Sequence, residues 1–393
     1  MLHKSVEIVL TSNCVVRPVA SGGQQLRAEV NLPDGGVPVY FKLLSAGSVP
    51  VELSWSPEAQ VAMGLIPAMC SGVALQVDGE IDPVFHENLS VVQDLFACWL
   101  SSADKVRIGP VRAAQTGGPD SSRRALFFSG GVDSMFSLLR HRDKITDLIY
   151  VHGYDVALGD DALRQSVSAY LGDVARTFGV NLIEIETNLR GLLDQHALWL
   201  YGHGPALASV GHLFKGQFSH FYISSTYDYR KLLPCGTHPM VDPRWSSTLV
   251  KFLHDGAEVS RVSKVMAIAE SSDARRLLRV CWVAPHAEML NCCRCEKCIR
   301  TMVALKALNR LQENEAFKMA FAASQVRTVE LNDVVRDLWQ ENYDLLTRTG
   351  NDPRLLGEVA LLLQPSALLC IVDKFRAINR RRLAKRKARR ARL

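Results

Sequence analysis

Residues 125–134 read Ala-Leu-Phe-Phe-Ser-Gly-Gly-Val-Asp-Ser, and this stretch decides the fold. Four apolar residues, 125–128, predict a buried strand, and the spacing of Met135, Leu138 and Leu139 predicts that an amphipathic helix follows. Between them, two glycines let the backbone approach an anion closely, and the first turn of a helix directs free N–H groups at it. The sequence therefore predicts a phosphate-binding loop at the carboxyl end of a strand, where open α/β sheets bind ligands.

The polar side chains of this loop suit the same purpose. Ser129 and Ser134 supply hydroxyl donors, and Asp133 supplies an acceptor for a magnesium ion or a bound water. The loop is not a Walker A motif, because it lacks the pattern Gly-x-x-x-x-Gly-Lys-Ser/Thr. An ordinary glycine-rich turn between a strand and a helix is the other interpretation of these residues.

The size and composition of the chain bound its class. Its 393 residues are enough for two or three domains and for a large core without disulfide support. The first 14 residues hold only a short apolar stretch, interrupted by Glu7, so we expect no signal peptide. The sequence has no stretch of about 18 apolar residues, which predicts that no segment spans a membrane. We therefore expect a cytoplasmic protein.

The net charge of +6 arises from the C-terminal tail. From Lys374 onward there are eleven Lys or Arg residues and no acid, so the rest of the chain has 35 basic and 40 acidic residues. An acidic body is not suited to nucleic-acid binding. Only the tail is expected to contact nucleic acid, non-specifically and through phosphates.

The chain divides by pattern into several stretches. Residues 1–114 resemble a separate α+β module of unknown role, with helices that begin at Ser56-Pro57 and Asp82-Pro83. The strands expected in this module are 6–11, 25–32, 37–43 and 73–77. The remaining stretches are a Gly/Pro/Ser linker at 115–124, a nucleotide-binding domain at 125–302, a helical region at 303–373 and a basic tail at 374–393.

Strand and helix patterns alternate within the nucleotide-binding domain. Beyond the first strand, the expected strands are 148–151, 182–185 and 221–224. The expected helices are 134–140, 161–178 and 205–218. Such alternation predicts an α/β domain with a doubly wound parallel sheet.

The second informative stretch is a cluster of cysteines. Cys292, Cys295 and Cys298 have the spacing C-x-x-C-x-x-C, and Cys281 lies eleven residues before them. Four thiolates in tetrahedral geometry make a closed structural zinc site, so we expect these four residues to bind Zn²⁺. Cys293 is the odd member and is expected to point away from the metal.

Other interpretations of the same cysteines remain open. An iron–sulfur cluster uses the same ligands, a catalytic sulfur carrier uses reactive thiols, and reduced cysteines can also cluster by chance. A secreted disulfide framework is disfavoured, because it would spread its cysteines along the chain.

The loop and the cysteines together resemble a known group of enzymes. Ser-Gly-Gly-Val-Asp-Ser at 129–134 resembles the PP-loop of the ATP pyrophosphatases, which typically cut ATP between its α and β phosphates. A PP-loop followed by Cys…Cys-x-x-Cys-x-x-Cys resembles the 7-cyano-7-deazaguanine synthase (QueC) family. That family binds ATP and zinc and uses ammonia to convert a carboxylate to an amide and then to a nitrile.

The resemblance implies a PP-loop fold (adenine nucleotide alpha hydrolase-like) and the cofactors ATP, Mg²⁺ and Zn²⁺. It implies a nucleotide-phosphate role for the loop residues Ser129, Gly130, Gly131, Val132, Asp133 and Ser134. It implies zinc ligation by Cys281, Cys292, Cys295 and Cys298. Ser263-Lys264 resembles the family's Ser-Lys segment, so Asp133 and Lys264 are the implied catalytic residues.

The resemblance covers about residues 124–302 and has departures within it. His152-Gly153-Tyr154-Asp155 stands where the family has Tyr-Gly-Gln, and residues 224–248 replace the family's base-recognition segment. The substrate is therefore not expected to be a deazaguanine, while the adenylating chemistry is retained.

The segment 224–248 follows the fourth strand of the domain and is expected on the ATP side of the sheet. Its candidate substrate-binding residues are Asp228, Arg230, His238, Asp242 and Arg244. The two arginines are suited to clamping an anionic substrate. A polar loop without a binding role is the alternative interpretation. His203 and His212 are expected to be hydrogen-bonded structural histidines.

Three functions follow from these patterns. The first is an ATP-dependent, AMP-forming ligase that activates a carboxylate or carbonyl-type oxygen of a small molecule for attack by ammonia or another nitrogen nucleophile. The second is a PP-loop thiolase of tRNA or a nucleobase that uses the cysteine cluster. The third is a non-catalytic nucleotide-binding partner protein. The expected partner is a small molecule, with no membrane, and a homo-oligomer is possible.

Overall fold

The computed structural model describes residues 13–19, 24–111, 121–214, 216–281 and 289–364. Within them, ten strands form one sheet in the order β10-β9-β6-β7-β8-β3-β2-β1-β4-β5. The strands are β1 (Asn13–Val19), β2 (Gln25–Leu32), β3 (Gly35–Ser45), β4 (Ala74–Ile81), β5 (Ile108–Val111), β6 (Arg124–Phe127), β7 (Asp147–His152), β8 (Asn181–Thr187), β9 (His220–Ser224) and β10 (Lys251–Asp255).

The sheet is mostly parallel, and its two halves differ. β10, β9, β6, β7 and β8 run parallel to their neighbours. β8, β3, β2 and β1 pair antiparallel in turn, and β4 and β5 continue parallel to β1. The protein is therefore α/β with a mostly parallel central sheet, as the alternation of strand and helix patterns predicts.

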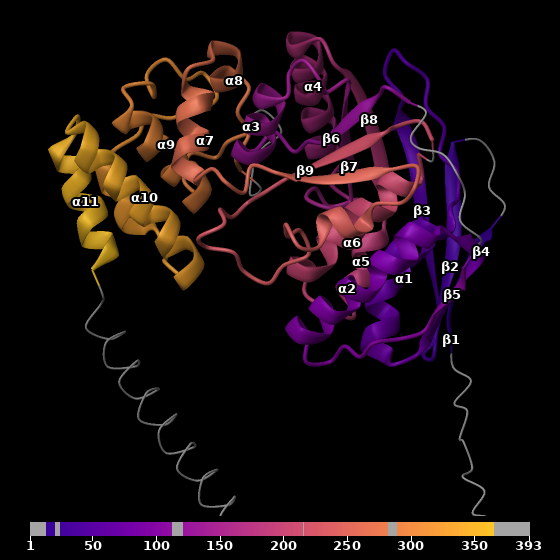
Figure 1. The fold of residues 1–393 in the computed structure, drawn as a ribbon. Coiled ribbons are helices and arrows are strands. Elements are labelled where there is room, and N and C mark those ends of the chain that lie inside the picture. Colours follow the sequence, from indigo (N-terminus) through magenta and orange to yellow (C-terminus); the bar gives the residue numbers. More distant parts are fainter. Residues whose placement is uncertain (1–12, 20–23, 112–120, 215, 282–288, 365–393) are drawn as a thin grey trace, which may run out of the picture.

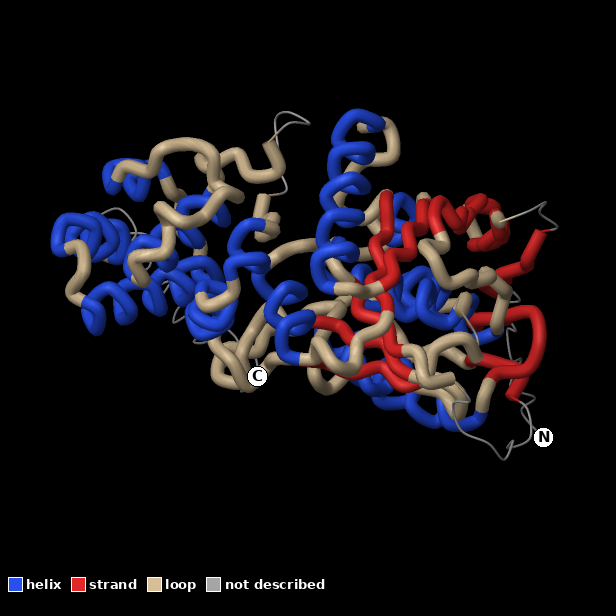
Figure 2. The backbone as a smooth tube through the Cα atoms, turned by 90° about the horizontal axis from the view of Figure 1, so that it is seen from above, coloured by secondary structure: helices blue, strands red, loops and turns tan. Residues whose placement is uncertain are grey.

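Helices cover both faces of the sheet. They are α1 (Pro57–Ser71), α2 (Pro83–Trp99), α3 (Val132–Arg140), α4 (Asp161–Phe178), α5 (Leu189–Leu193), α6 (Trp199–His212), α7 (Arg261–Ala269), α8 (Ser272–Arg276), α9 (Glu296–Ala307), α10 (Asp333–Thr349) and α11 (Pro353–Leu363), with 3₁₀ turns η1 (Asp242–Trp245) and η2 (Ala323–Thr328). Figures 1 and 2 show α9, α10 and α11 at one end of the molecule and the first five strands at the other. None of the described helices is long and apolar enough to cross a membrane.

Two hydrophobic cores lie on opposite faces of the sheet. Side chains alternate between faces along a strand, so neighbours in the strand that precedes the loop enter different cores. Ala125 and Phe127 pack in the core that α1, α2, α5 and α6 share. Leu126 and Phe128 pack in the core of α3, α4, α7, α9, α10 and α11. The loop after β6 thus begins between two filled cores, which fix its position.

The helix starts expected in the first 114 residues are confirmed. Ser56 accepts a hydrogen bond from the backbone N–H of Ala59 at 3.1 Å and caps α1, with Pro57 in the first turn. Asp82 caps α2 in the same way, through the N–H groups of Val84 and Phe85. Serine and aspartate satisfy N–H groups that a helix cannot bond internally.

β1 to β5, which belong to the stretch 1–114, are part of the same sheet as the other described strands, which differs from the expectation of a separate module. β3 pairs with β8, and the N–H of Tyr40 donates to Oδ1 of Asn188 at 2.9 Å. Buried side chains of β1 to β4 also belong to the hydrophobic core that contains side chains of β6 and β7. Strand patterns do not reveal which strands pair across a long sequence separation, so the sequence could not predict that β3 pairs with β8. Most of the expected linker, residues 115–120, lies outside the described residues, as do the expected strand 6–11 and the basic tail 374–393.

Two expected helical segments also differ. α6 begins at Trp199 and ends at His212, whereas the sequence predicts 205–218. Gly202, Gly204 and Pro205 lie inside it, and such residues disfavour helix on local grounds. The segment 308–332 is irregular apart from η2, whereas the sequence predicts helix there; the left-handed conformation of Asn309 (φ 57°) follows the end of α9.

Candidate functional site

The loop after β6 lies where the order of the parallel strands reverses. β7 and β8 lie on one side of β6, and the chain then crosses to β9 and β10 on the other side. The loops after β6 and β9 therefore diverge at the same edge, which is the position at which open α/β sheets bind ligands. The glycine loop 129–134 and the segment 224–248 both leave the sheet at this point.

Two glycines give the loop its shape. Gly130 has φ of 80°, a conformation that glycine adopts without strain. A Cβ atom at Gly130 would lie 2.3 Å from the hydroxyl oxygen of Tyr170, so nothing larger fits. Gly131 is the N-cap of α3, and no side chain bonds the N–H groups of the first turn. These N–H groups are positioned to bind an anion.

The serines and Arg279 hold the loop together. The hydroxyls of Ser129 and Ser134 lie 3.4 Å apart, and the backbone N–H of Ser129 donates to Oγ of Ser134 at 3.3 Å. The backbone N–H of Arg279 donates to the Gly130 carbonyl at 2.9 Å, and its guanidinium donates to the Ser129 carbonyl at 3.1 Å. The expected hydroxyl donors are thus present at the loop, bonded to each other.

Asp133 is paired with two cations from α7. Oδ1 lies 3.2 Å from Nζ of Lys264, and Oδ2 lies 2.8 Å from Nη2 of Arg261. Lys264 is only 1% exposed and also donates to the Ser225 carbonyl at 2.6 Å. The two residues expected to be catalytic, Asp133 and Lys264, therefore lie together although 131 positions separate them.

Further buried cations surround Asp133. Burial, reinforced by the charge of Arg261, lowers the pKa of Lys297 to about 8 and that of Arg300 to about 10, and the charge of Asp133 acts on both. Nε of Arg261, Nε of Arg279 and Nη1 of Arg300 are buried and have no hydrogen-bond partner among the described residues. We call Arg261, Lys264, Lys297 and Arg300 the cation cluster. Guanidinium groups with buried, unpartnered donors, as in Arg261 and Arg300, are suited to an anionic ligand.

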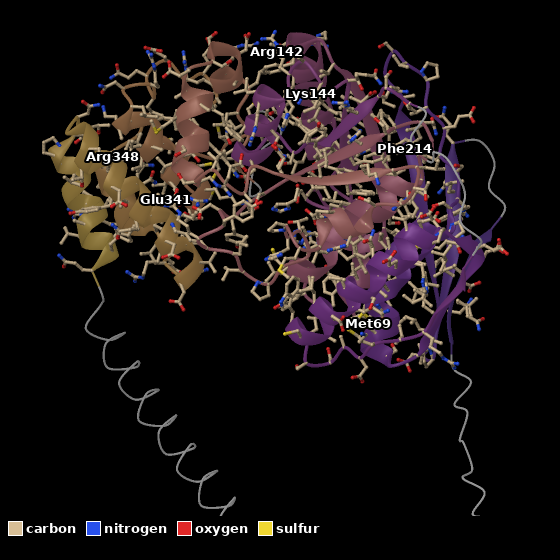
Figure 3. All side chains as sticks on the ribbon, in the orientation of Figure 1. Met69, Arg142, Lys144, Phe214, Glu341 and Arg348 are labelled. Atoms are coloured by element: carbon tan, nitrogen blue, oxygen red, sulfur yellow. The ribbon has the colours of Figure 1, made fainter. Side chains whose placement is uncertain are left out.

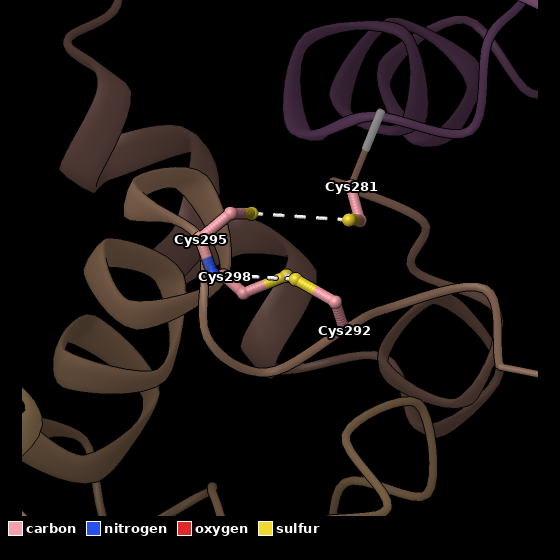
Figure 4. Close-up of side chains that lie close together, drawn as sticks. All are labelled: Cys281, Cys292, Cys295 and Cys298. Carbon is pink, nitrogen blue, oxygen red and sulfur yellow. Dashed lines mark hydrogen bonds between the residues drawn. The ribbon is translucent and has the colours of Figure 1, made fainter. Parts of the chain in front are cut away.

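Four cysteine sulfurs converge beside this cluster. Sγ atoms of Cys281, Cys292, Cys295 and Cys298 all lie within 4.8 Å of one another. The distances are 3.8 Å from Cys281 to Cys295 and 3.9 Å from Cys292 to Cys298 (Figure 4). A tetrahedral zinc ion with Zn–S bonds of about 2.3 Å requires sulfurs about 3.8 Å apart. The four residues can therefore hold a metal ion, and their geometry is compatible with zinc.

Local structure supports this arrangement. Asn291 accepts from the N–H groups of Val280 and Cys281 and donates to the carbonyl of Leu278, which joins the two cysteine-bearing segments. Hydrogen bonds among the sulfurs lower the pKa of Cys281 and raise the pKa values of Cys295 and Cys298. The close approach of the four sulfurs, and not these opposed shifts, supports metal binding.

Cys293 is separate from the four. It is fully buried, adopts a left-handed backbone conformation (φ 56°), and its Sγ donates to the Asn291 carbonyl. Burial raises the pKa of its thiol. The expectation that Cys293 points away from the cluster agrees with these contacts.

The candidate residues of segment 224–248 are engaged with protein partners. Arg230 forms two hydrogen bonds with the carboxylate of Asp228, at 3.0 and 3.2 Å. Arg244 donates to Oδ1 of Asn88 on α2 at 3.2 Å. Because the two arginines have different partners, the structure does not bring them together as a clamp.

A second polar cluster, the histidine–aspartate cluster, contains Asp242, His254 and His238. Asp242 is fully buried, and its Oδ2 lies 2.7 Å from Nδ1 of His254. The backbone N–H of His238 donates to Oδ1 of Asp242 at 3.3 Å. Burial, followed by the charge of His254, lowers the pKa of His238. Asp242 and His238 thus support the fold of the segment.

Both histidines expected to be structural have hydrogen-bond partners. The ring of His203 bonds the Trp199 carbonyl and the Thr237 hydroxyl, at 3.0 and 2.9 Å. Nε2 of His212 bonds the Trp245 carbonyl at 2.8 Å.

Sequence reasoning missed most of the cation cluster. Arg261 lies three residues before Lys264, and Lys297 and Arg300 lie within the cysteine stretch. A spacing of three places residues on neighbouring turns of one helix face, a signal that could have found Arg261 with Lys264 and Lys297 with Arg300. That the two pairs lie around one aspartate depends on tertiary structure.

Family models, curated proteins and solved structures were all compared with this chain, and none matches it.

Proposed function

We propose that the protein is an ATP-dependent, AMP-forming ligase of the PP-loop kind, similar to the QueC family. It activates a carboxylate or carbonyl-type oxygen of a small molecule for attack by ammonia or another nitrogen nucleophile. One observation carries the proposal: the glycine loop with the free first turn of α3 lies at the reversal of strand order and faces the cation cluster.

The charge of the site suits a polyphosphate. Arg261 and Lys264 pair with Asp133, Arg279 bonds a carbonyl of the loop, and Arg300 pairs with Glu296. The charges of Asp155 and Glu341 also act on Lys297 and Arg300, respectively. Loop N–H groups and these cations would stabilise the negative charge that accumulates on pyrophosphate as it leaves. No lysine lies within the loop itself, which distinguishes it from loops that expose a γ phosphate to attack.

The chemistry balances in two steps. The substrate oxygen attacks the α phosphorus, the bond from that phosphorus to the β-phosphate oxygen breaks, and pyrophosphate leaves with the electron pair. A nitrogen nucleophile then attacks the activated carbon, AMP leaves with the carbon–oxygen bond electrons, and the nitrogen loses a proton to solvent. The protein contributes positioning and charge stabilisation. Asp133 would hold Mg²⁺ in exchange for its contacts with Arg261 and Lys264, and the ion would neutralise phosphate charge.

The cysteine geometry supports a metal centre in preference to a sulfur carrier. All four sulfurs share one compact cluster, and a sulfur carrier needs a thiol that reaches substrate. For this reason we favour the ligase over the thiolase.

The experiment is a screen for pyrophosphate release. Purified protein is incubated with ATP, Mg²⁺, ammonia and pools of small carboxylic acids. We expect one class of acid to stimulate pyrophosphate release, with one AMP formed per pyrophosphate. The variant Asp133→Asn should lose that stimulation. Stimulation that is equal in Asp133→Asn would contradict the assignment of the site.

A further inference from the structure

We propose that α9 couples the metal centre to the anion site, so that a metal bound by the four cysteines positions Arg300 and Lys297 to bind the β and γ phosphates of ATP. This inference rests on the proposed function and assigns a role to the metal centre beyond stabilising the fold. It makes Arg300 and Lys297 phosphate-binding residues and the cysteines the residues that position them.

The residues of α9 that would bind the metal and those that would bind phosphate project from different sides of the helix. Cys295 is the N-cap of α9, and Cys298 lies in the first turn. Each residue of a helix is rotated by about 100° from the one before, so Arg300 projects about 200° away from Cys298. Lys297 lies between the two ligands in sequence. A metal bound by Cys295 and Cys298 would therefore fix the position of cations that project from other sides of α9.

Arg300 is held rigidly but incompletely satisfied. Its Nε donates to Oε1 of Glu296 at 2.9 Å, and the same oxygen accepts from Nε1 of Trp339 on α10. Asn342 donates to the Arg300 carbonyl at 3.0 Å. The side chain is more than nine-tenths buried, yet Nη1 has no hydrogen-bond partner among the described residues. A buried guanidinium with an unused donor calls for an anion.

Arg300 belongs to the same site as the loop. Its helix, α9, packs against α7, and Arg261 of α7 contacts Asp133 at 2.8 Å. Glu341 of α10, labelled in Figure 3, accepts from the N–H of Val262 at 3.0 Å, which ties the first turn of α7 to the C-terminal helices. α7 thus presents two cations to the aspartate at the start of α3, and α9 carries Lys297 and Arg300 beside α7.

Loss of the metal should release the first turn of α9. Helix ends lack internal hydrogen bonds, so they are the first parts of a helix to open when their restraints are removed. Lys297 lies in this first turn, and Arg300 lies in the turn that follows. A released turn would bind phosphate more weakly, because the cations must then be ordered on binding. Metal and phosphate binding are therefore coupled, and coupling acts equally in both directions.

The first measurement is calorimetric binding of Mg²⁺–pyrophosphate to the zinc-loaded protein. We expect Arg300→Met to bind on the order of tenfold more weakly than wild type with its zinc content unchanged, because a hydrogen bond to a charged group is lost. Arg300→Lys, which keeps the charge, should be intermediate. Lys306→Met, at the far end of the same helix, is the matched control and should bind like wild type.

The second measurement tests the coupling on the holoprotein. Zinc is withdrawn by a competing chelator with and without saturating Mg²⁺–pyrophosphate. We expect pyrophosphate to tighten zinc binding by about fivefold or more in wild type, the usual lower range of such coupling, and to have little effect in Arg300→Met.

Three results would overturn the inference. Zinc affinity in wild type that ignores pyrophosphate would show that the sites are independent. An equal effect of pyrophosphate in wild type and Arg300→Met would show that Arg300 does not carry the coupling. Absence of pyrophosphate binding to the wild-type holoprotein would overturn both this inference and the proposed function.

Discussion

Two polar clusters at the carboxyl ends of the parallel strands lie on opposite faces of the sheet and are built differently. In the cation cluster, Asp133 faces an excess of positive charge, and buried guanidinium donors lack partners among the described residues. In the histidine–aspartate cluster, the carboxylate of Asp242 bonds His254 and the backbone of His238, and Nε2 of His254 is buried without a hydrogen-bond partner among the described residues. Because both clusters contain an unpartnered polar atom, the comparison teaches that an excess of buried positive charge marks a candidate anion site better than polarity alone.

The largest expected effect concerns the metal centre beside the cation cluster. Reduced, purified protein should contain about one zinc per chain, and Cys295→Ser should lose the metal and much of its stability. Metal binding contributes roughly 10–16 kcal/mol in zinc-finger peptides, an amount comparable to the whole stability of a typical domain. Elemental analysis and thermal unfolding check both results. Cys293→Ser is the matched control, because it should keep the metal, and a metal-free protein of unchanged stability would contradict the assignment.

Replacing the aspartate of each cluster by asparagine compares the roles of the two clusters directly. Asp133→Asn should lower the rate of AMP formation by roughly 10²–10³-fold, the usual effect of removing one preorganised electrostatic contact. Asp242→Asn weakens a buried pair with His254, so it should lower the free energy of unfolding by about 1–3 kcal/mol and leave the rate per folded molecule nearly unchanged. Activity assays and urea unfolding of both variants measure this contrast. If Asp242→Asn abolished activity while staying folded, the histidine–aspartate cluster would be a ligand site as well.

The loop geometry predicts unequal effects of two alanines. Gly130→Ala places a Cβ atom 2.3 Å from the Tyr170 hydroxyl at a positive φ, so it should cost about 1–3 kcal/mol of stability or displace the loop. Gly131→Ala has no heavy atom nearer than 3.5 Å and should be nearly neutral for folding. Denaturant unfolding and Mg²⁺–ATP binding of the two variants test this, and equal behaviour would refute the loop geometry.

The smallest expected effect is a pH dependence of the free energy of unfolding that His203 causes. Burial lowers the pKa of His203 in the folded state, so the unfolded state binds the proton more readily. The contribution of His203 to stability is therefore present above its unfolded pKa of about 6.5 and is lost as the pH falls below that value. His203→Gln should flatten the fall in unfolding free energy between pH 7 and pH 5, as measured by urea titration. A variant whose curve runs parallel to that of wild type would contradict the sign.

The sequence predicted what local patterns determine. The strand expected at 125–128, the helix expected at 134–140 and the helix caps at Ser56 and Asp82 depend on residues close in sequence. The structure has the strand at Arg124–Phe127, the helix at Val132–Arg140 and both caps. β10 was missed because Lys251–Asp255 alternates weakly and carries a histidine and two charges. The pairing of β3 with β8 joins residues that are 139 to 146 positions apart, and no local signal encodes it.

The candidate site was predictable to the same extent. The spacing of the four cysteines could be read from the chain, because two-residue turns bring neighbouring sulfurs together. The partners of Asp133 could not, since Arg261 and Lys264 reach it from another helix. In the sequence, Arg230 and Arg244 seemed equivalent candidates for binding an anionic substrate. In the structure, Arg230 bonds Asp228 and Arg244 bonds Asn88.

The most direct test of the central claim is the identity of the nucleotide products. Protein is incubated with ATP labelled in the α phosphate, together with Mg²⁺, ammonia and an activating carboxylate, and the products are separated by chromatography. We predict AMP and pyrophosphate in equal amounts, because the loop and the cation cluster are arranged to stabilise a pyrophosphate leaving group. ADP and phosphate as the sole products would contradict the account.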